Sequence, residues 1–420
     1  MIQDLLYRCP VCGAFDWLEK DRCRSCGASF FMPTRSSARM NGESAPLSAW
    51  YAKTCAFDLP AGPDGFVMKS RRVRVSQESV SGLYKGFAGI TAYHFTRAPL
   101  DTGNLTLSHT RLSFTGVSVR LAVAVEDIVS ITIESNTLIV VDRRHGPLFF
   151  DFLEESGKMW EDLLRKVLVR HHAPEEIVEF YPRIRLGTSF KRHPATVQGH
   201  LRLRVPDRRW YRKDTSILET ILKPMGRLIL STAFKIETSG MENIPSAGPA
   251  VLLANHTSFL DSVFLGFFIR RTIWFMAKNS EYRHPFMKWF LRHASTFPVR
   301  RYTTDVLAVR NAVRVVAGGH LLGIFPEGER SWDGSMLPIR TGTVRLVLAL
   351  GVPVVPVGIR GAYEIMPRWT HSIRRTSITL NAGRPLVLPH IPIPAQTASD
   401  IADASRTIAS ELERLARGNT

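Results

Sequence analysis

Four of the five cysteines lie within the first 26 residues of this 420-residue chain, and their spacing constrains the local fold strongly. The segments CPVCG and CRSCG form the array C-x2-C-x10-C-x2-C from Cys9, Cys12, Cys23 and Cys26. Two thiolates three positions apart on a tight turn can bind one metal ion, and the glycine after each second cysteine permits that turn. Two such turns give the tetrahedral sulfur coordination that zinc favours. We predict a structural zinc site, with reduced, metal-free thiols as the alternative.

This cysteine block also indicates a compartment. Its spacing resembles the zinc-ribbon family over residues 5–30, which implies a small domain that depends on its metal for stability. The first residues, MIQDLLYRCPVCG, contain Asp4 and no basic stretch followed by an apolar run, unlike a secretory signal. We therefore expect a reducing, cytoplasmic environment, in which Cys55 is an ordinary core or linker cysteine.

The composition narrows the class of protein. Hydrophobic residues make up 45% and charged residues 22%, which excludes a disordered or collagen-like chain. The 55 Lys and Arg exceed the 37 Asp and Glu by 18, so an anionic partner is expected: nucleic acid, a phosphorylated substrate or an acidic lipid surface. Charged or polar residues interrupt the most apolar stretches, 217–234 and 251–269, so we expect no clean transmembrane helix.

The hydrophobic pattern predicts several domains. Residues 31–64 are rich in Ser, Ala, Pro and Gly and are predicted to be a linker. Residues 65–172 alternate with a strand period and end in a helical pattern, which predicts about seven short strands in a barrel or sandwich closed by a helix. Residues 183–213 are predicted to be a basic linker. From 215 to 420, apolar strands alternate with helices, which predicts an α/β domain with a central mixed sheet.

The β-rich block has a resemblance of its own. The stretches GNLTLSHTRLSFTG and VAVEDIVSITIESNTLIVV, followed by a helix, resemble pleckstrin-homology-like domains of the GRAM type over residues 65–172. Members of that family often bind lipid headgroups through basic loops, a role that the resemblance offers to Lys69, Arg71, Arg72 and Arg74. Alternatively, these residues form a solvated strand face and the domain is a scaffold.

The segment NHTSFLD, residues 255–261, follows an apolar strand and begins a helix. Ser258 and Asp261 have capping-box spacing, so Asp261 also has a purely structural interpretation. His256 and Asp261 would lie on different faces of a regular helix, so they meet only if His256 folds over the first turn from outside. There the positive helix end favours the neutral imidazole that a general base needs, and Asp261 can stabilise the imidazolium formed in the reaction.

Three further segments follow in order: FPVRR at 297–301, FPEGERS at 325–331 and VPVVPVGIRG at 352–361. Arginine binds phosphate through two parallel hydrogen bonds, so a His–Asp pair with clustered arginines suits deprotonation of a hydroxyl on a phosphorylated molecule. The chain has no serine-nucleophile motif, Walker loop or dinucleotide fingerprint, which leaves hydrolase, kinase and dehydrogenase functions without support.

These four segments resemble the glycerolipid acyltransferase family, typified by lysophosphatidic acid acyltransferases, over about residues 215–395. The resemblance implies acyl transfer from acyl-CoA or acyl-carrier protein to a lysophospholipid hydroxyl, most simply that of 1-acylglycerol-3-phosphate, with no cofactor in catalysis. It implies that His256 is the base and Asp261 its partner. It assigns acceptor binding to Arg300, Arg301, Glu327, Gly328 and Arg330, and an acyl-chain wall to Val354, Val355, Pro356 and Val357.

The sequence departs from the family pattern beside the predicted anion site. Glu329 stands where the third motif commonly has threonine, which adds a negative charge there. Arg340 stands where lysine is frequent, which keeps the charge. In the implied reaction His256 takes the proton of the attacking hydroxyl without an acyl-enzyme, and the backbone N–H of Gly328 is a candidate donor to the oxyanion.

We predict peripheral attachment to the cytoplasmic face of an anionic membrane. The basic segment 183–213, with Trp210 and Tyr211, and an apolar helix at 215–236 would make the contact; the alternatives are a solvated linker and a plain packing helix. Two other functions stay open: the same chemistry on another lysolipid, and a non-catalytic lipid- or nucleic-acid-binding regulatory protein. Specific nucleic-acid binding is not expected, because aromatic residues are not interleaved with the basic ones.

Overall fold

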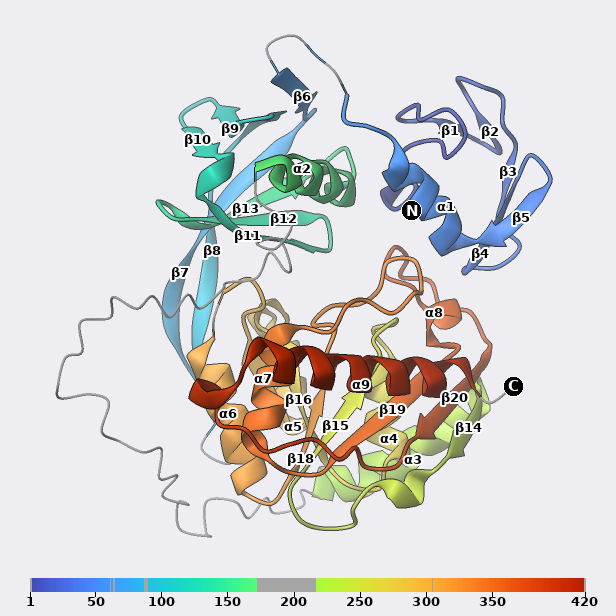
Figure 1. Cartoon of the computed structure of the whole chain (residues 1–420), viewed down its shortest axis with the longest axis vertical. Helices are drawn as coiled ribbons and strands as arrows, with labels where there is room; N and C mark the ends of the chain where they lie inside the picture. Colours follow the sequence, from blue (N-terminus) through green and yellow to red (C-terminus); the bar gives the residue numbers. More distant parts are fainter. Residues whose placement is uncertain are drawn as a thin grey trace, which may run out of the picture.

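The computed structural model describes residues 2–60, 62, 65–86, 90–171, 217–303 and 305–418. They form an N-terminal unit (2–60), a β-domain (65–171) and an α/β domain (217–418), with the first two side by side on one edge of the third (Figure 1). The predicted basic linker 183–213, including Trp210 and Tyr211, lies outside the described residues.

The N-terminal unit extends beyond the cysteine block. Its elements are β1 (Leu18–Glu19), β2 (Arg22–Cys23), β3 (Phe30–Phe31), β4 (Ser37–Met40), β5 (Glu43–Pro46) and α1 (Leu47–Ala56). The prediction of a linker at 31–64 is wrong, because β3, β4 and β5 form an antiparallel sheet that α1 covers. Leu47 and Trp50 are buried, and the Trp50 indole donates to the Ala38 carbonyl at 2.9 Å. A few well-spaced apolar residues therefore order a segment whose composition resembles that of a linker.

The β-domain contains the predicted strands and terminal helix, but its strands form one antiparallel sheet instead of the two sheets of a sandwich, and no strand pairing among the described residues closes it into a barrel. Its strands are β6 (Phe66–Lys69), β7 (Val73–Lys85), β8 (Thr91–Ser108), β9 (Arg111–Gly116), β10 (Arg120–Ala124), β11 (Ile128–Glu134), β12 (Thr137–Asp142) and β13 (Gly146–Phe152). Helix α2 (Gly157–His171) buries Trp160, Leu164 and Leu168 against them. A further difference from prediction is length: β7 and β8 form a long hairpin that reaches down to the α/β domain (Figure 1).

The α/β domain contains the predicted mixed sheet, in the order β14-β20-β19-β15-β18-β16-β17. The strands are β14 (Lys235–Ser239), β15 (Ala250–Ala254), β16 (Ile273–Lys278), β17 (Thr296–Val299), β18 (Leu321–Ile324), β19 (Val354–Arg360) and β20 (Ser377–Ala382). The five strands from β19 to β17 are parallel, whereas β20 is antiparallel to β19 and pairs in parallel with β14. The carboxyl ends of the five parallel strands therefore meet along one edge.

Helices cover both faces of this sheet, which the apolar strands require. The helices are α3 (Ile217–Ala233), α4 (Asp261–Phe268), α5 (Pro285–His293), α6 (Val306–Ala317), α7 (Thr341–Leu350), α8 (Ala362–Ile365) and α9 (Ala398–Arg417). Phe264 of α4 belongs to one core, and Ala312, Val347 and Ile408 of α6, α7 and α9 belong to the other. In α9, which buries Ile401, Ile408 and Leu412, a Thr397–Asp400 capping box fixes the first turn.

Direct contacts join the three parts. Tyr84, Ile90 and Ala92, at the end of the β7–β8 hairpin, pack in the same core as α6 and α7. The Arg35 guanidinium of the N-terminal unit donates to the Ser372 carbonyl at 2.8 Å. The Glu78 carboxylate of β7 lies 3.4 Å from an Arg283 guanidinium nitrogen, deep in the interface. The β-domain and the N-terminal unit are thus built onto the α/β domain.

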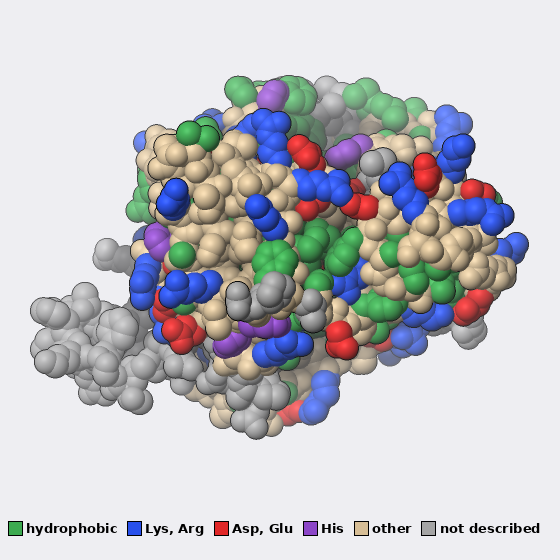
Figure 2. All heavy atoms as spheres, turned by 90° about the horizontal axis from the view of Figure 1, so that it is seen from above, with side chains coloured by type: hydrophobic (Ala, Val, Ile, Leu, Met, Phe, Trp, Pro, Cys, Tyr) green, Lys and Arg blue, Asp and Glu red, His purple; other side chains and the backbone are tan. Residues whose placement is uncertain are grey.

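The distribution of charge on the surface can be compared with the anionic partners that the sequence predicts. On the face seen from above in Figure 2, Lys and Arg side chains are scattered among acidic ones, and hydrophobic side chains gather near the middle. This face shows no single basic stripe of the kind that tracks a nucleic-acid backbone. Within the described part of the chain, no helix has the length and apolar character needed to cross a membrane.

Candidate active site

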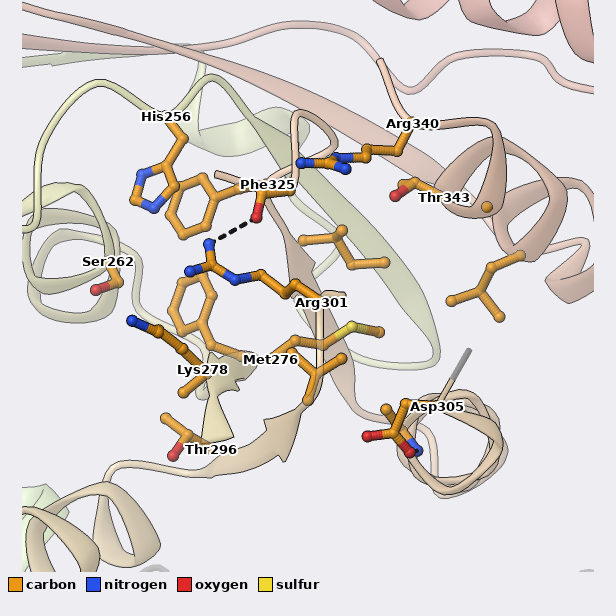
Figure 3. Close-up of a pocket in the computed structure, with 18 of the residues that line it drawn as sticks. His256, Ser262, Met276, Lys278, Thr296, Arg301, Asp305, Phe325, Arg340 and Thr343 are labelled. Carbon is orange, nitrogen blue, oxygen red and sulfur yellow. Dashed lines mark hydrogen bonds between the residues drawn. The ribbon is translucent and has the colours of Figure 1, made fainter. Parts of the chain in front are cut away.

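The predicted chemistry gathers at the carboxyl edge of the parallel strands. His256 follows β15, Arg301 follows β17 and Gly328 follows β18, and all three line a cavity of about 1350 Å³ (Figure 3). Ligands of open α/β sheets bind at this edge because the loops from neighbouring strands converge there. The volume exceeds the roughly 300–1,000 Å³ of most small-molecule sites and suits a long substrate.

His256 and Asp261 meet as the turn hypothesis requires. His256 lies outside α4, and its Nδ1 is 2.9 Å from Oδ2 of Asp261, the first residue of α4. The same oxygen accepts the backbone N–H groups of Thr257 and Ser258 at 2.7 and 2.8 Å. No side-chain cap is formed at Leu260, the N-cap of α4, so a simple capping box does not describe this turn. The carboxylate holds the loop and the imidazole together.

The surroundings of His256 favour its neutral form. Its ring stacks on Phe325 with centroids 3.9 Å apart and ring planes 13° from parallel. Burial lowers the pKa of His256 below its ordinary value, while the hydrogen bond to Asp261 opposes that shift. A neutral imidazole with Nδ1 held by Asp261 leaves Nε2 to accept a proton.

Glu327 supports this turn instead of lining the cavity. One carboxylate oxygen accepts the backbone N–H of His256 and the other that of Leu337, each at 2.7 Å. Burial raises the pKa of Glu327 to about 8, and these two N–H groups oppose the shift. The acceptor-binding role predicted for Glu327 is therefore replaced by a positioning role: it joins the loops after β15 and β18.

Three cations face the cavity near His256. Arg301 donates from Nη1 to the Gly328 carbonyl at 2.7 Å (Figure 3), and Lys278, at the end of β16, lies on the same side. Arg330 makes no salt bridge with the described residues. Burial, with Arg368 and Arg301 nearby, lowers the pKa of Arg330 to about 10, so it remains charged at neutral pH. Three positive groups beside His256 have the charge needed to bind an anionic group.

Two arginines neutralise the carboxylate of Glu329, which the family pattern does not have at this position of the FPEGERS segment. Glu329 accepts from Arg340 Nη2 at 3.1 Å and from Arg368 Nη1 at 2.7 Å. Arg340 also donates from Nε to the backbone carbonyl of Glu327 at 2.7 Å. Glu329 therefore fixes the loop and does not repel an anion at Arg301 and Arg330.

A glycine is needed at position 328 for the conformation of the turn and not for stabilisation of an oxyanion. Its φ is +74°, and a Cβ there would lie 2.4 Å from Nε of Arg340, so a side chain would displace that guanidinium. Its N–H donates to the Phe325 carbonyl at 3.0 Å. The prediction that this N–H stabilises the oxyanion is wrong, because the turn already uses it.

Arg300 also lines the cavity, and its guanidinium carbon lies 4.2 Å from the centroid of the Phe95 ring of the β-domain. One other prediction is corrected. The predicted acyl-chain wall, Val354–Val357, belongs to β19 in the middle of the sheet, is buried on both faces and is absent from the cavity lining. The apolar lining comes instead from β16, α4, α5 and α7, through Val263, Phe275, Met276, Phe290 and Leu346.

The cysteines form a second, separate cluster. The sulfur atoms of Cys9, Cys12, Cys23 and Cys26 lie within 4.8 Å of one another. Two pairs, Cys9–Cys26 and Cys12–Cys23, are 3.8 Å apart, which matches the edge of a tetrahedron with zinc–sulfur bonds of about 2.3 Å. Gly13 and Gly27 take positive φ and donate to the Cys9 and Cys23 carbonyls, closing both turns. Four sulfurs in this arrangement fit one metal ion.

The sequence analysis missed Lys278 and Phe325 as site residues. Each follows or ends a parallel strand, so the rule that ligands bind at the carboxyl edge would have indicated them. It also missed Glu134, whose carboxylate reaches Lys278 from β11 of the β-domain at 2.9 Å. Nothing local in the sequence indicates that contact.

Part of this chain is similar to known proteins. Residues 235–360 match the family model described as Acyltransferase. A chloroplastic 1-acyl-sn-glycerol-3-phosphate acyltransferase of Brassica napus is 30% identical over 181 residues, which cover 42% of this chain and 51% of that protein. A 1-acyl-sn-glycerol-3-phosphate acyltransferase of Bacillus subtilis is 26% identical over 136 residues, which cover 32% of this chain and 67% of that protein.

These similarities extend over only part of each protein. This chain spans about half the length of the chloroplastic relatives from Brassica napus and Arabidopsis thaliana. A solved structure of a 1-acyl-sn-glycerophosphate acyltransferase from Thermotoga maritima covers 49% of this chain and 80% of its own, with 22% identity and a TM-score of 0.38, too low to establish a shared fold. The family match nevertheless contains the His256 turn, the Arg301 turn and the Glu327 loop. Within the α/β domain, residues 235–360 are therefore similar to the acyltransferase family.

Proposed function

We propose that this chain is an O-acyltransferase that moves a fatty acyl group from acyl-CoA or acyl-carrier protein to the free hydroxyl of 1-acylglycerol-3-phosphate. The observation that carries the proposal is the His256–Asp261 pair, 2.9 Å apart, on the wall of a large apolar cavity that also holds Arg301 and Arg330. The names of the relatives in Brassica napus and Bacillus subtilis support this acceptor.

Each group has a defined task in this reaction. His256 Nε2 takes the proton of the acceptor hydroxyl as its oxygen attacks the thioester carbonyl, and Asp261 stabilises the imidazolium. The thiolate of the donor leaves as the carbonyl re-forms, and the imidazolium proton neutralises it. Arg301, Arg330 and Lys278 bind the acceptor phosphate, and the apolar lining of β16 and α5 contacts acyl chains.

The test uses purified protein, labelled acyl-CoA or acyl-carrier protein, and a panel of lysolipids that differ in headgroup. We expect labelled phosphatidic acid from 1-acylglycerol-3-phosphate, and no product with the His256→Ala variant. Acylation of a different lysolipid alone would keep the chemistry and change the acceptor. Lack of any product with every donor and acceptor would contradict the proposal.

We further propose peripheral attachment to the cytoplasmic face of a membrane through the surface beside the cavity. Phe286, Trp289 and Phe290 of α5 and Leu228 and Ile229 of α3 are all more than 40% exposed. Trp289 and Phe290 also line the cavity, so an acyl chain could pass between a bilayer and the cavity. Tryptophan and phenylalanine beside basic residues are typical of interfacial helices. In a flotation assay, we expect anionic vesicles to bind the protein in low salt, and binding to persist partly in high salt through α5.

For the N-terminal parts, we propose that the cysteine cluster holds one zinc ion in a ribbon and that the β-domain is pleckstrin-homology-like. The four-sulfur geometry supports the first, and an antiparallel sheet followed by α2 supports the second. Lys69, Arg71, Arg72 and Arg74 are exposed and available to a lipid headgroup, although Arg71 already contacts Asp16. Metal analysis of reduced protein should give one zinc per chain; none would contradict the ribbon.

A further inference from the structure

Glu134 brings a carboxylate of the β-domain to the edge of the cavity. It is the last residue of β11, and its side chain is 6% exposed. One carboxylate oxygen lies 2.9 Å from Lys278 Nζ, and the other lies 3.3 Å from Arg301 Nη2. Both cations line the cavity near His256 (Figure 3). A residue from a different domain is therefore bonded to two members of the proposed acceptor site.

The two cations need such a partner. The side chains of Lys278 and Arg301 are only 19% and 25% exposed, so water screens their mutual repulsion poorly. Burial lowers the pKa of Lys278, and Arg301 lowers it further, whereas Glu134 opposes both effects. The pKa of Glu134 is itself lowered by these cations despite burial, so its carboxylate stays charged. Without it, two desolvated like charges would share one wall.

Glu134 also fixes the direction of Arg301. The guanidinium is held at two points, by the Gly328 carbonyl at 2.7 Å and by Glu134. The neighbouring residue, Ile133, accepts a hydrogen bond from Arg368, which also donates to the Arg330 carbonyl at 2.9 Å. The end of β11 is thus bonded directly to the turn after β17 and, through Arg368, to the loop after β18.

These contacts leave donors for an acceptor. A guanidinium has five N–H groups and an ammonium has three, and Glu134 and the Gly328 carbonyl engage only some of them. Nε of Arg301 is buried and has no partner among the described residues. Glu134 therefore orients the two cations without exhausting their hydrogen-bonding capacity.

We propose that Glu134 is a positioning residue of the acceptor site, which bridges and aligns Arg301 and Lys278 so that together they receive the anionic headgroup of the acceptor. The proposal rests on the acyltransferase function proposed above. It makes the site a product of two domains: the α/β domain supplies the base and the cations, and the β-domain supplies their counter-charge.

The test compares two glutamines in the full chain. Glu134→Gln keeps the shape and removes the charge. Glu78→Gln is the matched control, because Glu78 is also a buried β-domain carboxylate that crosses the same interface, but it contacts Arg283 and Tyr302 away from the cavity lining. We expect Glu134→Gln to raise the acceptor KM about tenfold, with kcat at saturating acceptor and the acyl-donor KM each within about twofold. Glu78→Gln should leave the acceptor KM within about twofold.

Three outcomes would overturn the proposal. An unchanged acceptor KM in Glu134→Gln would mean that the cations need no counter-charge. A lower acceptor KM would mean that Glu134 competes with the headgroup. An equal rise in both variants would assign the effect to domain docking, which the thermal unfolding midpoints of the two proteins would register. If the unaltered chain acylates no lysolipid, the proposed function fails, which is a result distinct from all three.

Discussion

The cysteine cluster and the cavity around His256 are two sites built in opposite ways. The cluster draws all four sulfurs from one short stretch, in which two glycine turns aim them at a common point. The cavity draws its groups from the ends of four strands and from Glu134, more than a hundred residues earlier in the chain. The first arrangement follows from spacing alone, whereas the second exists only once the sheet and the β-domain have packed.

The two sites should therefore fail differently. Leu6 and Trp17 pack into a core shared with the β-domain, but the two short turns that carry the cysteines are held mainly by their ligands, so the order of these turns should depend on a bound metal. The cavity is supported by buried strands and by bonded pairs such as His256–Asp261, so single changes there should affect chemistry more than folding. The following four experiments test that contrast, beginning with the largest expected effect.

His256→Ala should lower kcat by about 10²–10⁴-fold, because a general base supplies acceleration of that order. Its thermal unfolding midpoint should stay close to that of the unaltered protein, since among the described residues the imidazole is hydrogen-bonded to Asp261 alone and stacks on Phe325. His371→Ala, on an exposed loop, is the control and should keep full turnover. Near-normal turnover of a folded His256→Ala variant would contradict the assignment of His256 as the general base.

Arg330→Ala should raise the acceptor KM by about 10- to 100-fold, since it removes a charge-assisted contact to the phosphate. The acyl-donor KM should change little. Arg310→Ala removes an exposed arginine of α6 outside the cavity lining and should behave like the unaltered protein. An effect confined to the acyl-donor KM would indicate that Arg330 binds the phosphates of the acyl donor and not that of the acceptor.

Replacing both Cys9 and Cys12 by serine should release the metal and disorder the start of the N-terminal unit. Turnover should fall by less than about tenfold, because the unit touches the α/β domain at Arg35 and not at the cavity. Cys55→Ser, outside the cluster, should keep the metal. Mass spectrometry measures the metal content, and turnover is measured on the same samples. Retention of the metal in the double variant would contradict the assignment of these cysteines as ligands.

The smallest expected effect is a displaced pH profile. Burial lowers the pKa of His256, so the neutral base persists below the ordinary histidine value of about 6.5, and activity is lost only as the pH falls through the lowered pKa. The acid limb of kcat/KM should therefore lie below pH 6.5. A limb at or above that pH would mean that Asp261 outweighs burial.

The sequence predicts contacts between neighbouring residues better than contacts between distant strands or domains. The turn that joins His256 to Asp261 is local, so its contact follows from five positions of sequence. Val354–Val357 are as apolar as a lining would be, but the sequence does not show that β19 lies mid-sheet with both faces covered. Lys278 and Glu134 look like ordinary charged residues, because each owes its role to a partner in another strand or domain. Residues 31–64 were misjudged because few apolar side chains order them.

The long β7–β8 hairpin decides how the protein can be divided. Tyr84 stacks edge-on against Tyr282 with ring centroids 5.1 Å apart, and the Asn311 side chain donates to the Thr91 carbonyl at 2.8 Å. A fragment that begins near residue 217 would expose Tyr282 and leave the Asn311 amide without that partner. We therefore expect that segment 235–360 does not fold by itself in this protein and that an active fragment has to include the hairpin. An exchange of either domain with a relative should keep both sides of this contact.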